Sequence, residues 1–478
     1  SSATAGHELA LTAGVTHILS AALWVGGLFA VFLLSIDLPQ DDFGSFTSGV
    51  KRFSFIALIC ILLLATSGLA NATTRLDSLG QLISTGYGQV VLIKTLLILV
   101  LGAFGYAYRR RVIPRLTGPR RGAFVTLAVP ELLLMGLAIG LGVSLATSPY
   151  PKIEDVFASL GESLLGFAYP PPPTPVAVIL GFYPDALFLT GALAAAALYV
   201  LGYYKVRKAG IRWPAARLAS WLTGIGTVIW STNSGIAIYS QVSVGLHMTQ
   251  HMALTMLGPI LLVLGAPMTL ALRALAPSTG HERGPREWLV WFLHSPVTRV
   301  LTNPFFVLIV YVLALYGLYL TPLFGWLMGS HVGHVTMQLH FVMSGYLFYW
   351  VLIGIDPRPK PLPYWARLLL LLVAMAIHGF FAVALMMGTT PLAVEWYGLV
   401  QPEWIVDPLQ DTLYGGQVTW GLAEIPNLVV LIAIAVQWSR SDDREARRRD
   451  RQADRDDDAE LRAYNEYLAS LSHRNNPS

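Results

Sequence analysis

The stretch Val244–Pro267, VGLHMTQHMALTMLGPILLVLGAP, is an apolar run of membrane-spanning length that opens with two histidines and three methionines. His247 and His251 are four residues apart, so on a helix they lie one turn above the other, with Met248 and Met252 as a parallel pair beside them. Two imidazoles with soft thioethers are the ligands that Cu(I) prefers. The same pattern is also typical of methionines that fill a core and of histidines that cap or hydrogen-bond a helix end.

The composition of the whole chain indicates a membrane protein. It has 478 residues, of which 54% are hydrophobic and 13% charged, and it contains many apolar runs long enough to cross a bilayer. Because lipid offers no hydrogen bonds to an unpaired backbone, we expect an all-α, polytopic membrane helical bundle without strands. The lone cysteine, Cys60, excludes a disulfide framework, a CxxC pair and a Cys-rich zinc site. Any metal must therefore be held by His, Met or carboxylate.

The apolar runs predict about eleven spans, four plus seven, separated by a segment that ends in four prolines and cannot continue as a helix. We accordingly expect a four-helix domain over 1–146, an external Pro-rich linker over 147–183, a seven-helix domain over 184–438 and a charged cytoplasmic tail over 439–478. The expected spans are Leu9–Ile36, Phe53–Ala70, Gly88–Tyr108, Ala123–Ala146, Pro184–Tyr204, Leu218–Ile238, Val244–Leu264, Pro304–Leu320, Val332–Ile355, Trp365–Gly388 and Tyr414–Trp438.

Basic residues are concentrated in alternate loops, and this distribution predicts the orientation. We expect a bacterial plasma-membrane protein with its amino terminus outside and its carboxyl terminus in the cytoplasm. The tail mixes both charge signs densely, which favours a solvated helix or disorder and no nucleic-acid partner. The chain opens at Ser1 without a Met, so we expect it to be the mature or truncated part of something longer. The loop residues that carry the orientation argument are Arg109, Arg110, Arg111, Arg115, Arg120, Arg121, Lys205, Arg207, Lys208, Arg212, Arg217, Arg273, Arg283, Arg286, Arg299, Arg358, Lys360 and Arg440.

A second group of histidines lies at the outer end of the ninth expected span. His334, Met337 and His340 are spaced three and three, which forms one stripe along a helix. Opposite the seventh span, this stripe predicts a site of two or three imidazoles with methionine ligands near the outer leaflet. The alternative is a helix packed with hydrogen-bonded histidines. Three further histidines fall in the outer halves of spans or at their outer ends: His17, His331 and His378.

Three charged residues fall well inside expected spans, away from their first residues, where ionisable groups are costly and point to function. Lys94 and His17 lie at similar depth, so they line one polar path unless Lys94 snorkels to the interface. Glu131 and Glu424 each stand beside a proline that frees a backbone carbonyl. They are either neutral and hydrogen-bonded or relay protons or ions.

These residues belong to segments that resemble known families. HMTQHMALTMLGPILLVLGAP, HVTMQLHFVMSGYLFYW followed by GIDPRP, IHGFFAVALMMG and DPLQDTLYGGQVTWGLAEIP are similar to the CtaG family of bacterial cytochrome c oxidase assembly proteins, over about 184–438. THILSAALWVGGL and GYGQVVLIKTLLIL resemble the CopD family of copper-resistance membrane proteins, over about 7–146. A fusion of the two is similar to proteins of actinobacteria. The resemblance implies copper handling for oxidase maturation, with His247, His251, His334 and His340 matching the motif histidines.

Three functional hypotheses follow. The first is a non-enzymatic carrier or insertion factor for copper, as Cu(I), whose partners are copper ions, the copper-bearing subunits of cytochrome c oxidase and the lipid bilayer. In it, Met248, Met252 and Met337 supplement the four motif histidines. The second is a haem-binding electron-transfer protein, because histidine pairs facing across helices also hold haem. The third is a structural accessory subunit of a respiratory complex, in which the histidines only pack.

Overall fold

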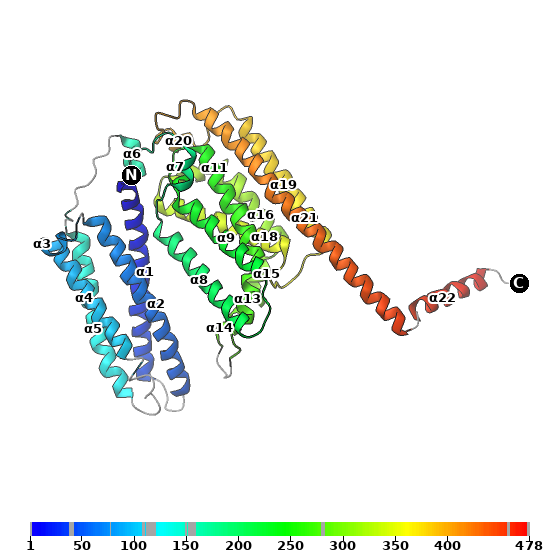
Figure 1. The fold of residues 1–478 in the computed structure, drawn as a ribbon, viewed down its shortest axis with the longest axis horizontal. Coiled ribbons are helices and arrows are strands. Elements are labelled where there is room, and N and C mark those ends of the chain that lie inside the picture. The colour runs from blue at the N-terminus through cyan, green and yellow to red at the C-terminus, as the bar shows by residue number, and fades with distance from the viewer. Residues whose placement is uncertain are drawn as a thin grey trace.

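The computed structural model describes residues 2–37, 43–76, 78–107, 110, 121–148, 151, 159–278, 283–456 and 459–475. These residues form helices, and the one β-bridge among them joins Phe182 to Ser234. The expected helical bundle is therefore confirmed, and Figure 1 shows it as two bundles with a long helix that projects from the second. Of the basic loop residues, Arg109, Arg111, Arg115 and Arg120 lie outside the described residues.

The amino-terminal bundle consists of four long helices: α1 (Ser2–Asp37), α2 (Phe43–Arg75), α4 (Gly86–Ala107) and α5 (Arg121–Thr147), with the short α3 (Gln81–Ser84) before α4. A small core of its own holds it together. Trp24, Leu28, Cys60, Leu101 and Met135 are buried in one hydrophobic cluster that contains no residue of the second bundle. Cys60 is a buried free thiol, as the absence of any other cysteine requires.

The segment expected to be a linker is folded from Ser159 onward. It forms α6 (Leu160–Leu165) and α7 (Pro175–Leu180) and packs on the second bundle, where Phe167 is 1% exposed. The proline run supplies acceptors, because Trp404 Nε1 donates to the carbonyl of Pro170 and Tyr239 Oη to that of Pro171, each at 2.8 Å. The run cannot form a helix, and its carbonyls are free to accept these bonds. Residues 159–183 are thus part of the second bundle.

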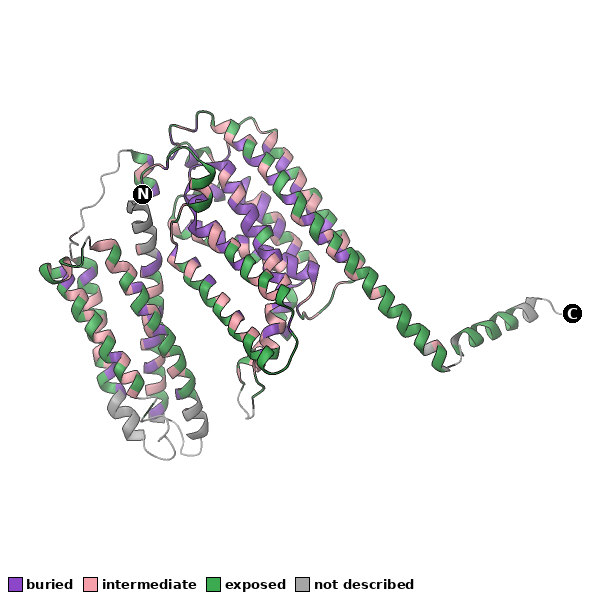
Figure 2. Ribbon diagram, in the orientation of Figure 1, coloured by how far each residue is buried: buried purple, intermediate pink, exposed green. Residues whose placement is uncertain are grey.

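The second bundle contains the main hydrophobic core. Figure 2 shows that buried residues concentrate in its inner helices, while the projecting end of the last long helix is exposed. Its elements are α8 (Ala186–Lys208), α9 (Ala215–Asn233), α10 (Gly235–Tyr239), α11 (Val244–Met252), η4 (Ala253–Leu257), α12 (Gly258–Leu264), α13 (Pro267–Ala274), α14 (Pro285–His294), α15 (Pro296–Leu301), α16 (Pro304–Val312), η5 (Leu313–Gly317), α17 (Leu323–Met328), α18 (His331–Ile353), α19 (Tyr364–Met386), α20 (Val394–Tyr397), α21 (Pro408–Asp456) and α22 (Ala459–Asn475).

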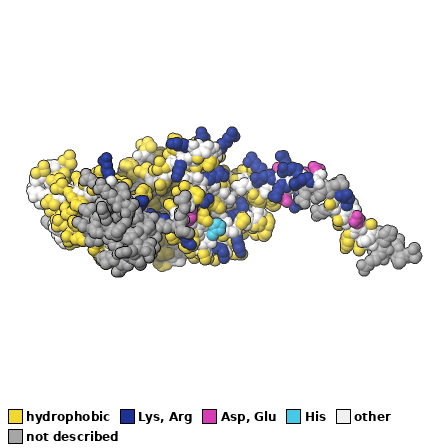
Figure 3. All heavy atoms as spheres, turned by 90° about the horizontal axis from the view of Figure 1, so that it is seen from below, with side chains coloured by type: hydrophobic (Ala, Val, Ile, Leu, Met, Phe, Trp, Pro, Cys, Tyr) yellow, Lys and Arg dark blue, Asp and Glu magenta, His cyan; other side chains and the backbone are white. Residues whose placement is uncertain are grey.

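Nine helices in the described part of the chain are long and apolar enough to cross a membrane, and the chain is a multi-pass membrane protein. The two other expected spans are also helical, but they do not meet that measure. Pro304–Gly317 is shorter, and α9 over Ala215–Asn233 is not among the nine. The basic loops gather at one end of the second bundle, where Figure 3 shows many Lys and Arg side chains. The orientation across the membrane stays a prediction.

Buried carboxylates hold the inner helices at their amino-terminal ends. Asp356 lies after α18 and accepts hydrogen bonds from the backbone nitrogens of Met268 and Thr269, at 3.1 and 2.8 Å, in the first turn of α13. Burial raises the pKa of the Asp356 carboxyl, although these hydrogen bonds act to lower it. A negative group at a helix amino terminus satisfies free N–H groups and complements the helix dipole. Asp356 of the GIDPRP segment therefore links the end of α18 to the start of α13 through hydrogen bonds.

Candidate metal centre

The centre of the second bundle contains a bridge of two histidines and one tyrosine. His247 and His251 on α11 are 0% and 1% exposed. The hydroxyl of Tyr319 lies 2.9 Å from His247 Nε2 and 2.9 Å from His251 Nδ1. The predicted stacking of the two imidazoles on one helix face is what allows a single hydroxyl to reach both. His247 Nε2 and His251 Nδ1 are thus both hydrogen-bonded to the Tyr319 hydroxyl.

Asp411 of α21 fixes the start of the histidine helix. Its carboxylate accepts hydrogen bonds from Ser243 Oγ at 2.9 Å and from the backbone nitrogens of Val244 and Gly245 at 2.6 and 3.3 Å. Gly245 permits this approach, since a Cβ there would lie 2.4 Å from the Tyr414 ring. The motif DPLQDTLYGG of α21 therefore positions the helix that carries His247.

Two π-helical turns flank the bridge. The turn η4 begins one residue after Met252, and Thr255 Oγ1 within it donates to the carbonyl of His251. The turn η5 ends at Gly317, two residues before Tyr319. A π-turn inserts an extra residue into an α-helix and is frequent at functional sites. In this bundle, such a turn adjoins each of the two elements that contribute to the bridge.

The helix α18 lies against η4 and α12, so the predicted apposition of the two histidine helices is observed. The contact is close because Gly345 has no side chain: a Cβ there would lie 2.0 Å from the carbonyl oxygen of Thr255. The Phe341 ring packs edge-on against His251, with centroids 4.1 Å apart. From α17, the Phe324 ring contacts His247 at 4.8 Å. The bridge is enclosed by aromatic rings.

Two imidazoles near this bridge keep a buried nitrogen without a hydrogen bond of normal geometry. They are Nδ1 of His247, whose interaction with the Ser240 backbone falls outside normal hydrogen-bond geometry, and Nε2 of His334 on α18. His334 is 7% exposed and lies within electrostatic range of His247. Buried polar atoms without a partner are rare in proteins and mark a place where water or an ion belongs.

The remaining predicted ligands do not form one shell with these atoms. Among the residues that the structure describes, no group of three or more His, Cys, Asp or Glu side chains is arranged to hold a metal ion. His340 is on an exposed face of α18, and His331 begins that helix half-buried. The three-residue spacing rotates the stripe around the helix, so His334 faces the core and His340 faces away. The shared site of His247, His251, His334 and His340 is not preformed among the described residues, and its formation around a metal ion stays a prediction.

His378 is a separate buried centre on α19. Its Nε2 donates to the Thr419 carbonyl at 3.3 Å, and its Nδ1 shares a hydrogen bond of 3.0 Å with the Tyr311 hydroxyl. Both ring nitrogens thus have a partner. This arrangement matches the hydrogen-bonded alternative for an intramembrane histidine.

The predicted methionine ligands are buried in the main core. Met248, Met252 and Met337 are each at most 2% exposed. Met248 faces α21, because a Cβ on Gly415 would lie 3.3 Å from its Cγ. It therefore packs beside the bridge, between α11 and α21.

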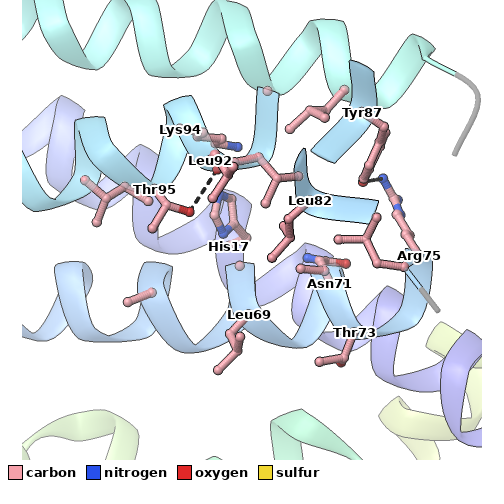
Figure 4. Close-up of a pocket in the computed structure, with 18 of the residues that line it drawn as sticks. His17, Leu69, Asn71, Thr73, Arg75, Leu82, Tyr87, Leu92, Lys94 and Thr95 are labelled. Atoms are coloured by element: carbon pink, nitrogen blue, oxygen red, sulfur yellow. Dashed lines mark hydrogen bonds between the residues drawn. The ribbon is translucent and has the colours of Figure 1, made fainter. Parts of the chain in front are cut away.

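The charged residues inside spans have different surroundings. His17 and Lys94 line one pocket in the amino-terminal bundle, and Figure 4 shows both side chains extending into it. Glu131 is 4% exposed within α5. Glu424 lies on an exposed face of α21, whereas Asn427 one turn later is buried and accepts from Tyr349 Oη at 3.2 Å.

Comparison with known proteins places both halves in families. The model of the cytochrome c oxidase caa3 assembly factor family, Caa3_CtaG, matches residues 197–441, just over half of the chain. The chain belongs to this family. The model of copper resistance protein D, CopD, matches residues 49–145. This family member is thus a fusion of the two types, as the motifs indicated.

Similar proteins occur in mycobacteria, which are actinobacteria. An uncharacterized protein of Mycobacterium leprae is 44% identical over 315 residues, which cover 65% of this chain and 48% of that protein. One of Mycobacterium bovis is 39% identical over 368 residues, covering 76% and 55%. The chain spans about half the length of these relatives. The copper transport protein CutJ of Bacillus subtilis is 34% identical over 145 residues, covering 30% and 26%. No solved structure matches the chain.

Proposed function

We propose that this Caa3_CtaG family member carries copper within the membrane and passes it to cytochrome c oxidase during assembly. The observation that carries the proposal is the pair of buried imidazole nitrogens, His247 Nδ1 and His334 Nε2, which have no normal hydrogen bond and come from two spans that contact each other through η4, α12 and α18. Imidazole nitrogens are good copper ligands, and the thioethers of nearby methionines suit Cu(I). The family descriptions, which name oxidase assembly and copper resistance, agree with this cargo.

The Tyr319 bridge controls which nitrogen is available for the metal. A phenol has one proton, so when Tyr319 donates to His251 Nδ1, His247 must donate from Nε2. A neutral His247 then bears its lone pair on Nδ1, the atom without a normal partner. In the reverse arrangement Nδ1 carries a proton and cannot bind copper. Conversion between the two arrangements requires the hydroxyl to reverse and one proton on each imidazole to move from one ring nitrogen to the other, and His247 can bind copper through Nδ1 only in the first arrangement.

The surroundings favour copper over haem and over a purely structural role. The near nitrogens of His247 and His251 are engaged by Tyr319, and Phe341 and Phe324 pack against their rings. A porphyrin would have to displace these aromatic side chains, whereas a single ion needs only about 2 Å from each nitrogen. A packing role alone leaves two buried nitrogens without partners, which costs stability.

The test is Cu(I) binding by the purified full chain under reducing, anaerobic conditions, measured by metal analysis. We expect the His247→Ala and His334→Ala variants to lose the bound copper, while the His340→Ala variant retains it because that side chain faces outward. Copper that survives both core substitutions overturns the proposed ligand pair. A strong Soret band in the purified protein would instead support haem.

Delivery is tested separately in cells. We expect the same two core substitutions to reduce the copper content of isolated cytochrome c oxidase, and the His340→Ala control to leave it unchanged. A fully copper-loaded oxidase in cells that carry His247→Ala would favour the structural subunit and exclude the carrier role.

A further inference from the structure

A pocket of about 890 Å³ lies within the amino-terminal bundle, remote from the histidine–tyrosine bridge. It is enclosed by α1, α2, α4 and α5 near the junction with the short α3 (Figure 4). Its volume falls within the range of about 300–1,000 Å³ that is usual for sites of small molecules. Most of its lining is apolar, with a few polar groups that converge on it.

Lys94 and His17 are the innermost of these polar groups. The Lys94 ammonium lies in the space that Gly142 leaves open, since a Cβ there would be 3.1 Å from Nζ. His17 Nδ1 shares a hydrogen bond of 3.0 Å with Ser67 Oγ. Arg75 and Tyr87 stand together where α2 ends and α4 begins, with Arg75 Nη1 donating to Tyr87 Oη at 3.2 Å.

The formally charged side chains in the described lining of the pocket are Lys94 and Arg75. His17 lies within electrostatic range of Lys94, and Lys94 within range of Arg75. No Asp or Glu is among the described residues that line the pocket. A cationic side chain within a span needs a counter-charge or access to water, and neighbouring cations increase that need.

The pocket is also continuous with the outer surface of the bundle. Several of its apolar lining residues are largely exposed there, namely Ile18 at 68%, Leu69 at 68%, Leu79 at 84%, Leu92 at 42% and Leu99 at 66%. In a membrane-spanning bundle this surface faces acyl chains. A ligand with an anionic head and an alkyl chain would match both the cationic interior and the apolar rim.

We propose that this pocket binds an anionic phospholipid, with its headgroup phosphate at Lys94 and Arg75 and its acyl chains along the exposed leucines. Phosphate oxygens accept charge-assisted hydrogen bonds from ammonium and guanidinium groups, and no covalent step is involved. The proposed lipid site therefore lies in the amino-terminal bundle, whereas the histidine–tyrosine bridge lies in the second bundle.

The test uses the full chain, purified in a neutral detergent, and measures its thermal unfolding midpoint with added lipid. We expect phosphatidylglycerol to raise the midpoint of the wild type by several degrees and that of Lys94→Gln by much less. Lys94→Arg retains the charge and should keep most of the response. Lys51→Gln, which removes an exposed lysine of α2 outside the pocket, is the matched control and should respond as the wild type does.

Two comparisons identify the ligand. Phosphatidylcholine, which has a phosphate but no net charge, should give little stabilisation, and native mass spectrometry should detect phosphatidylglycerol retained by the wild type but not by Lys94→Gln. Equal stabilisation of the wild type and Lys94→Gln would overturn the site. A full response to inorganic phosphate alone would overturn the lipid as its source.

Discussion

The Tyr319 side chain links both histidines of α11 at the centre of the second bundle. Its hydroxyl contacts both imidazoles of α11, although it lies 68 residues from one and 72 from the other in the sequence. The HxxxH spacing predicted the stacked histidines, because helix periodicity is local. It could not predict their partner, since nothing local to a GLYL sequence indicates which helix that tyrosine will face. The one available signal was a tyrosine in an apolar span, which needs a hydrogen-bond partner when buried.

Replacing Tyr319 with Phe removes the bridge and leaves two more buried ring nitrogens without a partner. We expect the free energy of unfolding to fall by about 1–3 kcal/mol for these lost hydrogen bonds. Thermal or denaturant unfolding of the purified chain measures this. The control is Tyr316→Phe, which removes only one hydrogen bond, to the Ile377 carbonyl, and should cost less. Equal losses in the two variants would contradict the bridge as a stabilising unit.

At the scale of elements, the expected helices follow from sequence patterns and motifs, but the contact of α18 with η4 and α12 does not. Gly345 lies directly on the Thr255 carbonyl, and a glycine in an apolar run gives no sign of what approaches it. The same limit explains His340. The three-residue spacing placed it on the stripe of His334, whereas neighbouring helices decide which part of that stripe is buried. The two π-turns likewise have no signature in the apolar runs that contain them.

Gly345→Ala tests the contact between α18 and η4. A methyl group at this position overlaps the Thr255 carbonyl, so we expect destabilisation by about 1–3 kcal/mol, as for overpacked cores. Gly379→Ala in α19 is the matched control, because nothing lies within 4 Å of its added Cβ. The control should be neutral or up to about 1 kcal/mol more stable, since alanine favours helix. Unfolding midpoints of both variants decide between the expectations, and a neutral Gly345→Ala would argue against the close contact.

The π-turn η5 predicts an unusual tolerance to deletion. Because a π-turn holds an extra residue, removing one residue restores an α-helix without turning the flanking segments by about 100°. We expect deletion of Leu313, which is 58% exposed within η5, to leave a folded monodisperse protein. Deletion of Leu372, which is 52% exposed in the regular helix α19, should prevent the protein from folding to a monodisperse state. Size-exclusion chromatography of fluorescent fusions compares the two, and equal damage would refute the idea.

For the whole molecule, the sequence predicted the helical class and the two families, because composition and dispersed motifs carry both. The linker was the main error of organisation. Four prolines exclude a helix, but they do not exclude a segment that packs on the bundle. Residues 159–183 are held there by hydrogen bonds from Trp404 and Tyr239, which lie far along the chain. The count of eleven also assumed that every apolar helix spans, whereas nine described helices meet that measure.

The two bundles should be separable at a position set by this docked segment. Each has its own hydrophobic cluster, and they meet where α1 lies beside α8. We expect residues 159–478 to insert and fold alone, because a unit with its own core needs few outside contacts. A chain that begins at Pro184 loses Phe167 and the proline carbonyls and should aggregate. Chromatographic profiles of the two truncations in detergent provide the measurement, and identical profiles would mean that the docked segment is dispensable.

The unbroken course of α21 sets a fixed distance between the bilayer and its charged end. The helix has 49 residues, and a bilayer crossing takes about 20 of them. The part after Trp438, residues 439–456, extends about 27 Å beyond the hydrocarbon region at about 1.5 Å per residue. Its Arg-rich face is therefore presented to the aqueous phase well clear of the lipid headgroups (Figure 1). A molecule that binds the far end of this helix must therefore reach about 27 Å from the membrane or come from solution.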